Sequence, residues 1–104
     1  MNITLEARRI VLADDHAMVR LGFRLLLEGA GAMVVGEASS GEDAVRRYSE
    51  LLPEVLIMDV SMPGIGGLVA LERLRAAHST ARVLMLSAHH DAVVPVRALR
   101  LGAR

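Results

Sequence analysis

The sequence predicts an α/β fold in which a parallel sheet is covered by helices on both faces. Short runs of continuously apolar residues alternate with longer segments in which apolar residues recur at helical spacing. Gly, Pro, Ser and Asp residues separate these runs and supply turns and helix caps. Continuous apolar strands are typical of parallel sheets buried on both faces, and right-handed crossovers place helices over those faces. We therefore expect a three-layer, doubly wound sandwich.

Four apolar runs are predicted to be the strands. The first is followed at once by Asp14, the third by Asp59 and the fourth by Ser87, so three of the strands end in polar residues. In chain order the runs are Ile10–Ala13, Met33–Ala38, Val55–Met58 and Val83–Leu86.

Apolar residues at helical spacing predict a helix after each strand. The first helix begins near Met18 and ends at Gly29 and Gly31, and its apolar stripe lies at positions 18, 21, 22, 25 and 26. The second follows the capping segment Ser39–Glu42 and ends before Pro53. Its inward residues are expected to be Ala44, Val45, Tyr48 and Leu51.

The later helices are predicted in the same way. The third follows the turn-forming segment Ser61–Gly67 and is marked by Leu68, Leu71 and Leu74. The fourth is expected to begin near Val94–Pro95, because proline is tolerated in the first turn of a helix. Its inward residues would be Val96, Leu99 and Leu101.

Length and composition exclude several classes of protein. The 104 residues suffice for one domain, and 53% of them are hydrophobic, which suits a small, dense core. Twelve arginines balance twelve acidic residues, so a basic face for nucleic acid is not expected. No cysteine is present for a disulfide, and no apolar run approaches the roughly 18 residues that span a bilayer. With no apolar signal core at the N-terminus, we expect a soluble cytoplasmic protein.

The polar residues at the strand ends are the candidate functional residues. In open α/β sheets, ligands bind beyond the carboxyl ends of the strands. Asp14 and Asp15 follow the first strand, Asp59 follows the third and Ser87 follows the fourth. If the first and third strands are neighbours, three carboxylates converge on one pocket.

Such a cluster points to phosphoryl chemistry with a metal ion. Two carboxylates about 4 Å apart repel by about 4 kcal/mol at an effective dielectric constant near 20, and a divalent cation removes that cost. Hard oxygen donors in small number favour Mg²⁺. A carboxylate beside the metal can attack a phosphoryl group and form an acyl phosphate, while the metal neutralises charge on the phosphoryl oxygens. The hydroxyl of Ser87 could then donate a hydrogen bond to those oxygens.

Each of these residues also has a simpler structural interpretation. Asp15 could cap the first helix, and Asp59 could form an Asx-turn before the Pro63–Gly64 loop. Ser87 could make only a local backbone bond. The position of all the acids at the carboxyl ends of strands weakens these interpretations.

Two other residue types receive structural interpretations. Three loop histidines are expected to be solvated, since imidazole does not suit a Mg²⁺ site: His16, His89 and His90. Four methionines are expected to pack in the core: Met18, Met33, Met58 and Met85.

Three segments together resemble bacterial two-component receiver domains. They are Val11–His16, Asp59–Gly64 and Leu86–Ala88. The segment from Asp15 to Leu26 is most similar to the NarL/FixJ (LuxR-type) subfamily of transcription regulators. The resemblance extends from about Arg9 to the end of the chain and implies a flavodoxin-like (CheY-like) fold.

The resemblance implies a role for each matching residue. Asp59 would be the phospho-acceptor, and Asp14 and Asp15 would hold Mg²⁺ together with the backbone carbonyl of Ser61. Ser87 would turn its hydroxyl toward the phosphoryl group, with the small Ala88 leaving room for it. The donor would be a sensor histidine kinase or a small acyl phosphate. The protein would be a self-phosphorylating switch rather than a turnover enzyme, and phosphorylation could drive homodimer formation.

The sequence departs from the family pattern at its end. Family members continue past a segment like Leu101–Arg104 into a fifth strand, which carries an aromatic switch residue and a lysine, and then a fifth helix. No lysine occurs in this sequence. We therefore expect residues 1–104 to be a receiver domain that is incomplete at its C-terminus, with strand order 2-1-3-4. The resemblance also implies a C-terminal helix-turn-helix output domain that would bind DNA, which we expect to lie outside residues 1–104.

Two alternative functions stay open. A degenerate receiver would act by protein contacts alone, which the missing lysine favours and the intact acidic residues oppose. A metal-dependent phosphohydrolase of the haloacid-dehalogenase type would also use an aspartate after a strand. Such enzymes require a second aspartate two residues later, where this chain has Ser61.

Overall fold

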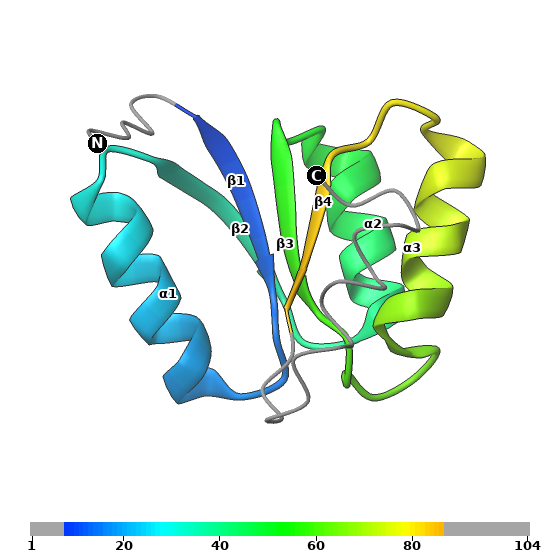
Figure 1. Cartoon of the computed structure of the whole chain (residues 1–104), viewed down its shortest axis with the longest axis horizontal. Helices are drawn as coiled ribbons and strands as arrows, with labels where there is room; N and C mark the ends of the chain where they lie inside the picture. The colour runs from blue at the N-terminus through cyan, green and yellow to red at the C-terminus, as the bar shows by residue number, and fades with distance from the viewer. Residues whose placement is uncertain (1–7, 87–104) are drawn as a thin grey trace.

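A computed structural model describes residues 8–86 and shows a parallel sheet between two helical layers (Figure 1). Helix α1 lies on one face of the sheet, and α2 and α3 lie on the other. The strand order is β2-β1-β3-β4, which confirms the predicted α/β sandwich and the predicted order. The elements are β1 (Arg9–Ala13), α1 (Ala17–Gly29), β2 (Met33–Ala38), α2 (Gly41–Leu51), β3 (Val55–Asp59), α3 (Gly66–Ala77) and β4 (Val83–Leu86).

The register of the strands brings the ends of β1 and β3 together. Both neighbours of β1 run parallel to it, and Ala13 at its end aligns with Ala38 of β2 and Met58 of β3. Asp14 follows Ala13 and Asp59 follows Met58, so the two aspartates lie at the same edge of the sheet. The condition on which the predicted site depends, that the first and third strands are neighbours, is therefore met.

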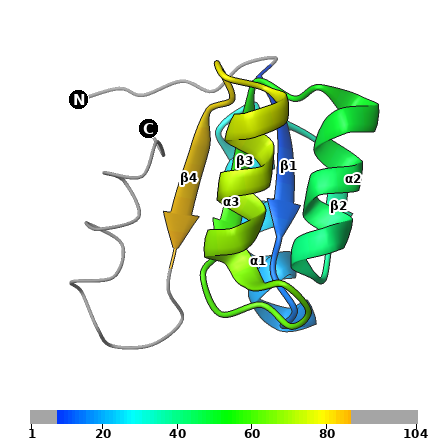
Figure 2. The ribbon, with the colours of Figure 1, turned by 90° about the vertical axis from the view of Figure 1, so that its right-hand side faces the viewer.

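The larger core lies between the sheet and the layer of α2 and α3, which lie side by side in Figure 2. Leu56, Met58 and Met85 of the sheet are buried there against Leu71 and Leu74 of α3. From α2, the buried Ala44 and Tyr48 and the partly buried Val45 and Leu51 pack into the same core. This confirms the predicted inward face of the second helix.

The smaller core lies under α1, where Ile10, Leu12 and Ile57 are buried. Helix α1 contacts it through Phe23 and Leu27, which are one helical turn apart. The predicted apolar stripe at positions 18, 21, 22, 25 and 26 was therefore wrong as the core-facing side of this helix. Apolar residues occur on more than one side of α1, so their spacing alone did not identify the side that meets the sheet.

Two of the four methionines predicted to be in the core are exposed. Met18 is 78% exposed on the outer side of α1, and Met33 is 54% exposed at the start of the edge strand β2. Met58 and Met85, in β3 and β4, are buried as predicted.

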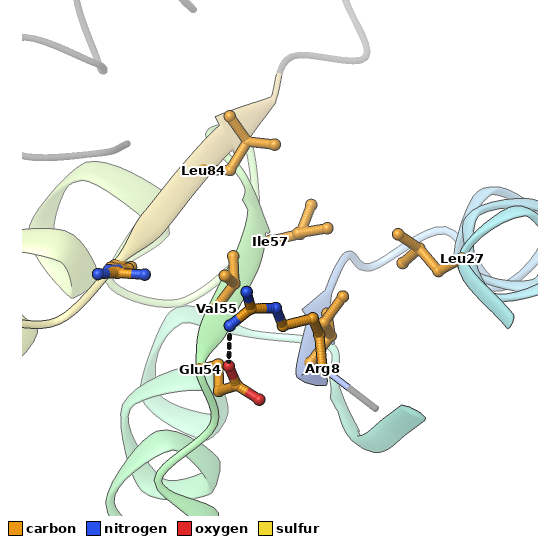
Figure 3. Close-up of a pocket in the computed structure, with 8 residues that line it drawn as sticks. Arg8, Leu27, Glu54, Val55, Ile57 and Leu84 are labelled. Carbon is orange, nitrogen blue, oxygen red and sulfur yellow. Dashed lines mark hydrogen bonds and ion pairs between the residues drawn. The ribbon is translucent and has the colours of Figure 1, made fainter. Parts of the chain in front are cut away.

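A hollow of about 320 Å³ lies on the face of the sheet that carries α1 (Figure 3). An ion pair of 2.7 Å between Arg8 and Glu54 borders it. Ile10, Val55 and Leu84, which line it, stand at or near the first residues of their strands. The hollow is therefore at the opposite end of the sheet from Asp14 and Asp59 and is not part of the candidate site. Its lining residues are Arg8, Ile10, Leu27, Glu54, Val55, Ile57, Arg82 and Leu84.

Several predictions concern residues outside the described range. The predicted fourth helix and its entry at Pro95 lie there, as do Ser87, Ala88, His89 and His90. Within residues 8–86, none of the helices has the length and apolar character needed to cross a membrane.

Candidate functional site

Four side chains converge at the carboxyl edge of the sheet. Asp14, Asp15 and His16 form the loop between β1 and α1, and Asp59 is the last residue of β3. One potential ligand atom from each of the four side chains lies within 4.8 Å of the corresponding atoms of the others. The three aspartates are those predicted from the sequence, whereas His16 was not predicted to belong to the cluster.

Asp59 is buried, and only one of its two carboxylate oxygens is satisfied. The residue is 2% exposed, and its Oδ1 accepts a hydrogen bond of 3.0 Å from the backbone N–H of Ser61. Its Oδ2 is buried and has no hydrogen-bond partner within residues 8–86. The Asx-turn interpretation therefore accounts for Oδ1 only. A buried anionic oxygen without a partner costs free energy, so Oδ2 requires another explanation.

Asp14 is held in place by hydrogen bonds of its backbone N–H and of its side chain. It is 8% exposed, and its N–H donates to the Ala38 carbonyl in β2 at 2.9 Å. Its Oδ1 accepts a hydrogen bond of 2.7 Å from the backbone N–H of His16. The N-cap residue of α1 is His16, without a side-chain cap, so the interpretation of Asp15 as the helix cap was wrong.

The imidazole of His16 contacts the carboxylates of both Asp14 and Asp15. Its Nδ1 is 3.2 Å from Asp14 Oδ1 and 3.1 Å from Asp15 Oδ1, although its side chain is 57% exposed. The prediction that this histidine is solvated was therefore right about exposure but missed its contact with both carboxylates. The contact is local, between adjacent residues of a loop, and spacing in the sequence does not reveal it.

The loop between β3 and α3 is fixed by bonds to its neighbours. Glu42, in the first turn of α2, accepts a hydrogen bond of 3.0 Å from the backbone N–H of Ile65. This bond is the main cause that lowers the pKa of Glu42. The Gly67 N–H donates to the Val60 carbonyl at 3.0 Å. Helix α3 begins at Gly66, so Gly66 and Gly67 belong to its first turn and not, as predicted, to the loop.

The donor set fits a small, hard divalent cation. Three carboxylates with ligand atoms within 4.8 Å repel one another by about 3 to 4 kcal/mol per pair at an effective dielectric constant near 20. A cation that takes oxygen ligands and keeps several waters removes this repulsion. Mg²⁺ matches those requirements. Asp14, Asp15 and Asp59 would hold it.

The family model of the response regulator receiver domain matches residues 10–104. The chain belongs to this family. The matched range contains every residue of the acidic cluster. The chain is thus a receiver domain of the kind found in two-component response regulators, as its sequence motifs predicted.

Relatives of this receiver agree with the subfamily suggested by the sequence. It is 42% identical over 96 residues to the response regulator GacA of Pseudomonas viridiflava, covering 91% of this chain and 45% of that protein. A LuxR-family two-component response regulator from Aurantimonas sp. SI85-9A1 has a TM-score of 0.83 and 36% identity, covering 94% and 71% of the two chains. The receiver domain of NarL from Mycobacterium tuberculosis has a TM-score of 0.81 and 36% identity, covering 94% and 80%. The chain spans less than half the length of the curated relative.

Proposed function

We propose that this receiver is a phosphorylation switch and that Asp59 Oδ2 accepts the phosphoryl group. The observation that carries the proposal is that this oxygen is buried, without a hydrogen-bond partner within residues 8–86, beside two further carboxylates. The Oδ1 atom is held by the Ser61 N–H, so the carboxylate is fixed with its other oxygen free to react. A pre-oriented nucleophile lowers the barrier because little freedom is lost on reaction.

Mg²⁺ is the proposed cofactor, held by Asp14, Asp15, Asp59 and the backbone carbonyl of Ser61. When bound, it would neutralise charge on the phosphoryl oxygens. The protein residues orient the reacting groups: the bonds of Asp14 to Ala38 and His16 fix the acidic loop beside Asp59.

The proposed donor is the phosphohistidine of a sensor histidine kinase, with small acyl phosphates as substitutes. Asp59 Oδ2 attacks phosphorus, the phosphorus–nitrogen bond of the donor breaks, and the released imidazole takes up a proton. The product is an acyl phosphate on Asp59, which water hydrolyses, so the domain acts as a switch and not as a turnover enzyme.

We also propose how phosphorylation of Asp59 is transmitted to an output. The Ser87 hydroxyl would turn toward the phosphoryl group and transmit its presence. The signal would favour a homodimer and reach an output domain, which we propose to be a DNA-binding transcription regulator in the cytoplasm. The similarity to GacA, a response regulator, supports a role in signal transduction.

Labelling with acetyl phosphate tests the proposed function. The full-length protein should gain one phosphoryl group, measured by intact mass, when Mg²⁺ is present and not when EDTA is added. Asp59→Asn should abolish the gain. Asp43→Asn is the matched control, because Asp43 lies in α2, outside the acidic cluster. Equal labelling of the Asp59 variant, or labelling unaffected by EDTA, would contradict the proposal, and an unlabelled wild type would favour a degenerate receiver.

A further inference from the structure

Arg20 of α1 links the acidic loop to strand β2. Its Nη1 donates a hydrogen bond of 2.6 Å to the backbone carbonyl of Asp14. Its Nε donates to Glu37 Oε1 in β2 at 2.7 Å. The side chain is 22% exposed, so most of it is shielded from competing water. A hydrogen bond from a charged guanidinium group is stronger than one between neutral groups, and partial burial protects it from water.

Glu37 holds Arg20 in position. Its two carboxylate oxygens pair with two arginines of α1, Oε1 with Arg20 and Oε2 with Arg24. The bond from Arg20 is the main cause that lowers the pKa of Glu37, so the carboxylate is charged at neutral pH. Glu37 directly precedes Ala38, whose carbonyl accepts the N–H of Asp14.

The two backbone polar groups of Asp14 are consequently tied to two adjacent residues of β2, Glu37 and Ala38. The N–H is bonded directly to Ala38, and the carbonyl is bonded to Glu37 through Arg20. A residue whose N–H and carbonyl are both hydrogen-bonded cannot rotate freely about its backbone dihedral angles. Its orientation determines where the side chains of Asp14 and the next residue, Asp15, are directed.

We infer that Arg20 is a positioning residue, which with Glu37 holds the Asp14–Asp15 loop in the geometry that binds a divalent cation. The inference rests on the proposed function and extends it beyond the acidic residues themselves. Groups that orient the ligands of a metal commonly change its affinity by about 10- to 100-fold when they are removed.

A purely electrostatic role of Arg20 would have the opposite sign. If the arginine acted only by its positive charge near the site, its removal would reduce repulsion of Mg²⁺ and tighten binding. If it positions the ligands, its removal weakens binding. The direction of the change therefore separates the two roles.

The test is a calorimetric titration of Mg²⁺ into the full-length protein and three variants. Arg20→Gln should bind Mg²⁺ at least about 10-fold more weakly. Arg24→Gln is the matched control: it removes the other arginine of Glu37 but no bond to Asp14, and should bind like the wild type. Arg20→Lys should lie between the two, because one ammonium group cannot reproduce the two-directional guanidinium contact. This variant also keeps the test informative if the Gln variant folds poorly.

Two further readouts separate positioning from general destabilisation. In the metal-free protein, the His16 amide, which is bonded to Asp14 Oδ1, should exchange its hydrogen faster in Arg20→Gln than in Arg24→Gln. The labelling rate of Arg20→Gln with acetyl phosphate should recover toward the wild-type rate as Mg²⁺ is raised to saturation.

The outcomes distinguish this inference from the proposed function. Unchanged or tighter Mg²⁺ binding by Arg20→Gln, or equal weakening by Arg24→Gln, would overturn the role of Arg20 alone. A wild-type protein that binds Mg²⁺ but is never labelled at Asp59 would overturn the proposed function alone. A wild type that binds no Mg²⁺ would overturn both.

Discussion

At the scale of single residues, Gly67 determines how closely α3 can approach the end of strand β3. A Cβ atom at this position would lie 2.4 Å from the Asp59 carbonyl oxygen and 2.8 Å from Val60 Cα. Both contacts are with backbone, which cannot move aside as a flexible side chain can. The first turn of α3 therefore requires glycine at this position, for space and not for a special backbone angle.

We predict that Gly67→Ala destabilises the protein by about 1 to 3 kcal/mol, because it overpacks backbone against backbone. Urea denaturation measures this change. Gly22→Ala is the control: nothing lies within 4 Å of a Cβ at Gly22, which is inside α1, so this variant should be stabilised by about 0.5 to 1 kcal/mol. Equal effects of the two substitutions would show that the close contact at Gly67 relaxes without cost.

The residues of the candidate site differ in how far the sequence reveals them. Asp14, Asp15 and Asp59 could be predicted, because each follows an apolar strand and the parallel sheet brings strand ends to one edge. Arg20 of α1 could not be predicted, because its acceptors are the backbone carbonyl of Asp14 and a glutamate on strand β2.

At the scale of elements, the start of α2 is fastened to the loop between β3 and α3. Glu42 accepts the N–H of Ile65, and Gly41 donates to the Pro63 carbonyl at 3.3 Å. The loop begins at the residue after Asp59, so these bonds help to determine its path beside the candidate site. Both bonds join segments that are distant in sequence, and helical periodicity does not predict them.

The contact made by Glu42 predicts a dependence of stability on pH. The hydrogen bond from the Ile65 N–H lowers the pKa of the Glu42 carboxyl below its ordinary value. A carboxyl group with a lowered folded-state pKa stabilises the protein above its unfolded-state pKa, and this contribution is lost as the pH falls through the folded-state value. We therefore expect Glu42→Gln to melt at a lower temperature than the wild type at neutral pH. The difference should shrink as the pH falls below about 4.5.

Thermal denaturation of the wild type and of Glu42→Gln, from neutral pH down to acid pH, measures the difference in melting temperature. Glu72→Gln is a suitable control, since Glu72 is exposed on α3. A difference that persists unchanged in acid would show that Glu42 acts through its shape and not its charge.

The spacing of apolar residues predicts the strands and the buried side of α2, but not the buried side of α1. The strands were predicted because a parallel strand buried on both faces is apolar throughout. The inward side of α2 was predicted because its other sides are polar. Helix α1 is apolar around most of its circumference, and only the sheet, through Phe23 and Leu27, determines which side is buried.

At the scale of the whole molecule, the two faces of the sheet are unequally covered. Two helices cover one face and α1 alone covers the other within residues 8–86. Leu25 and Leu26 of α1 are 62% and 73% exposed, and the hollow bordered by Arg8 and Glu54 lies on the same face. In the described part of the chain, the outer edge of β4 has no partner strand. Exposed apolar surface and an open strand edge both favour association.

We therefore predict that residues 1–104, expressed alone, melt at low temperature and self-associate. Roughly 100 Å² of apolar surface left in water forgoes about 2.5 kcal/mol of stabilisation. A few such areas equal much of the roughly 5 to 15 kcal/mol that stabilises a whole domain. Sedimentation measures the self-association, and thermal denaturation measures the melting temperature. Replacing Leu25 and Leu26 together with Gln should reduce the association, because both side chains are largely exposed and Gln is a good helix former. A monomeric, cooperatively melting and thermally robust domain would contradict the prediction.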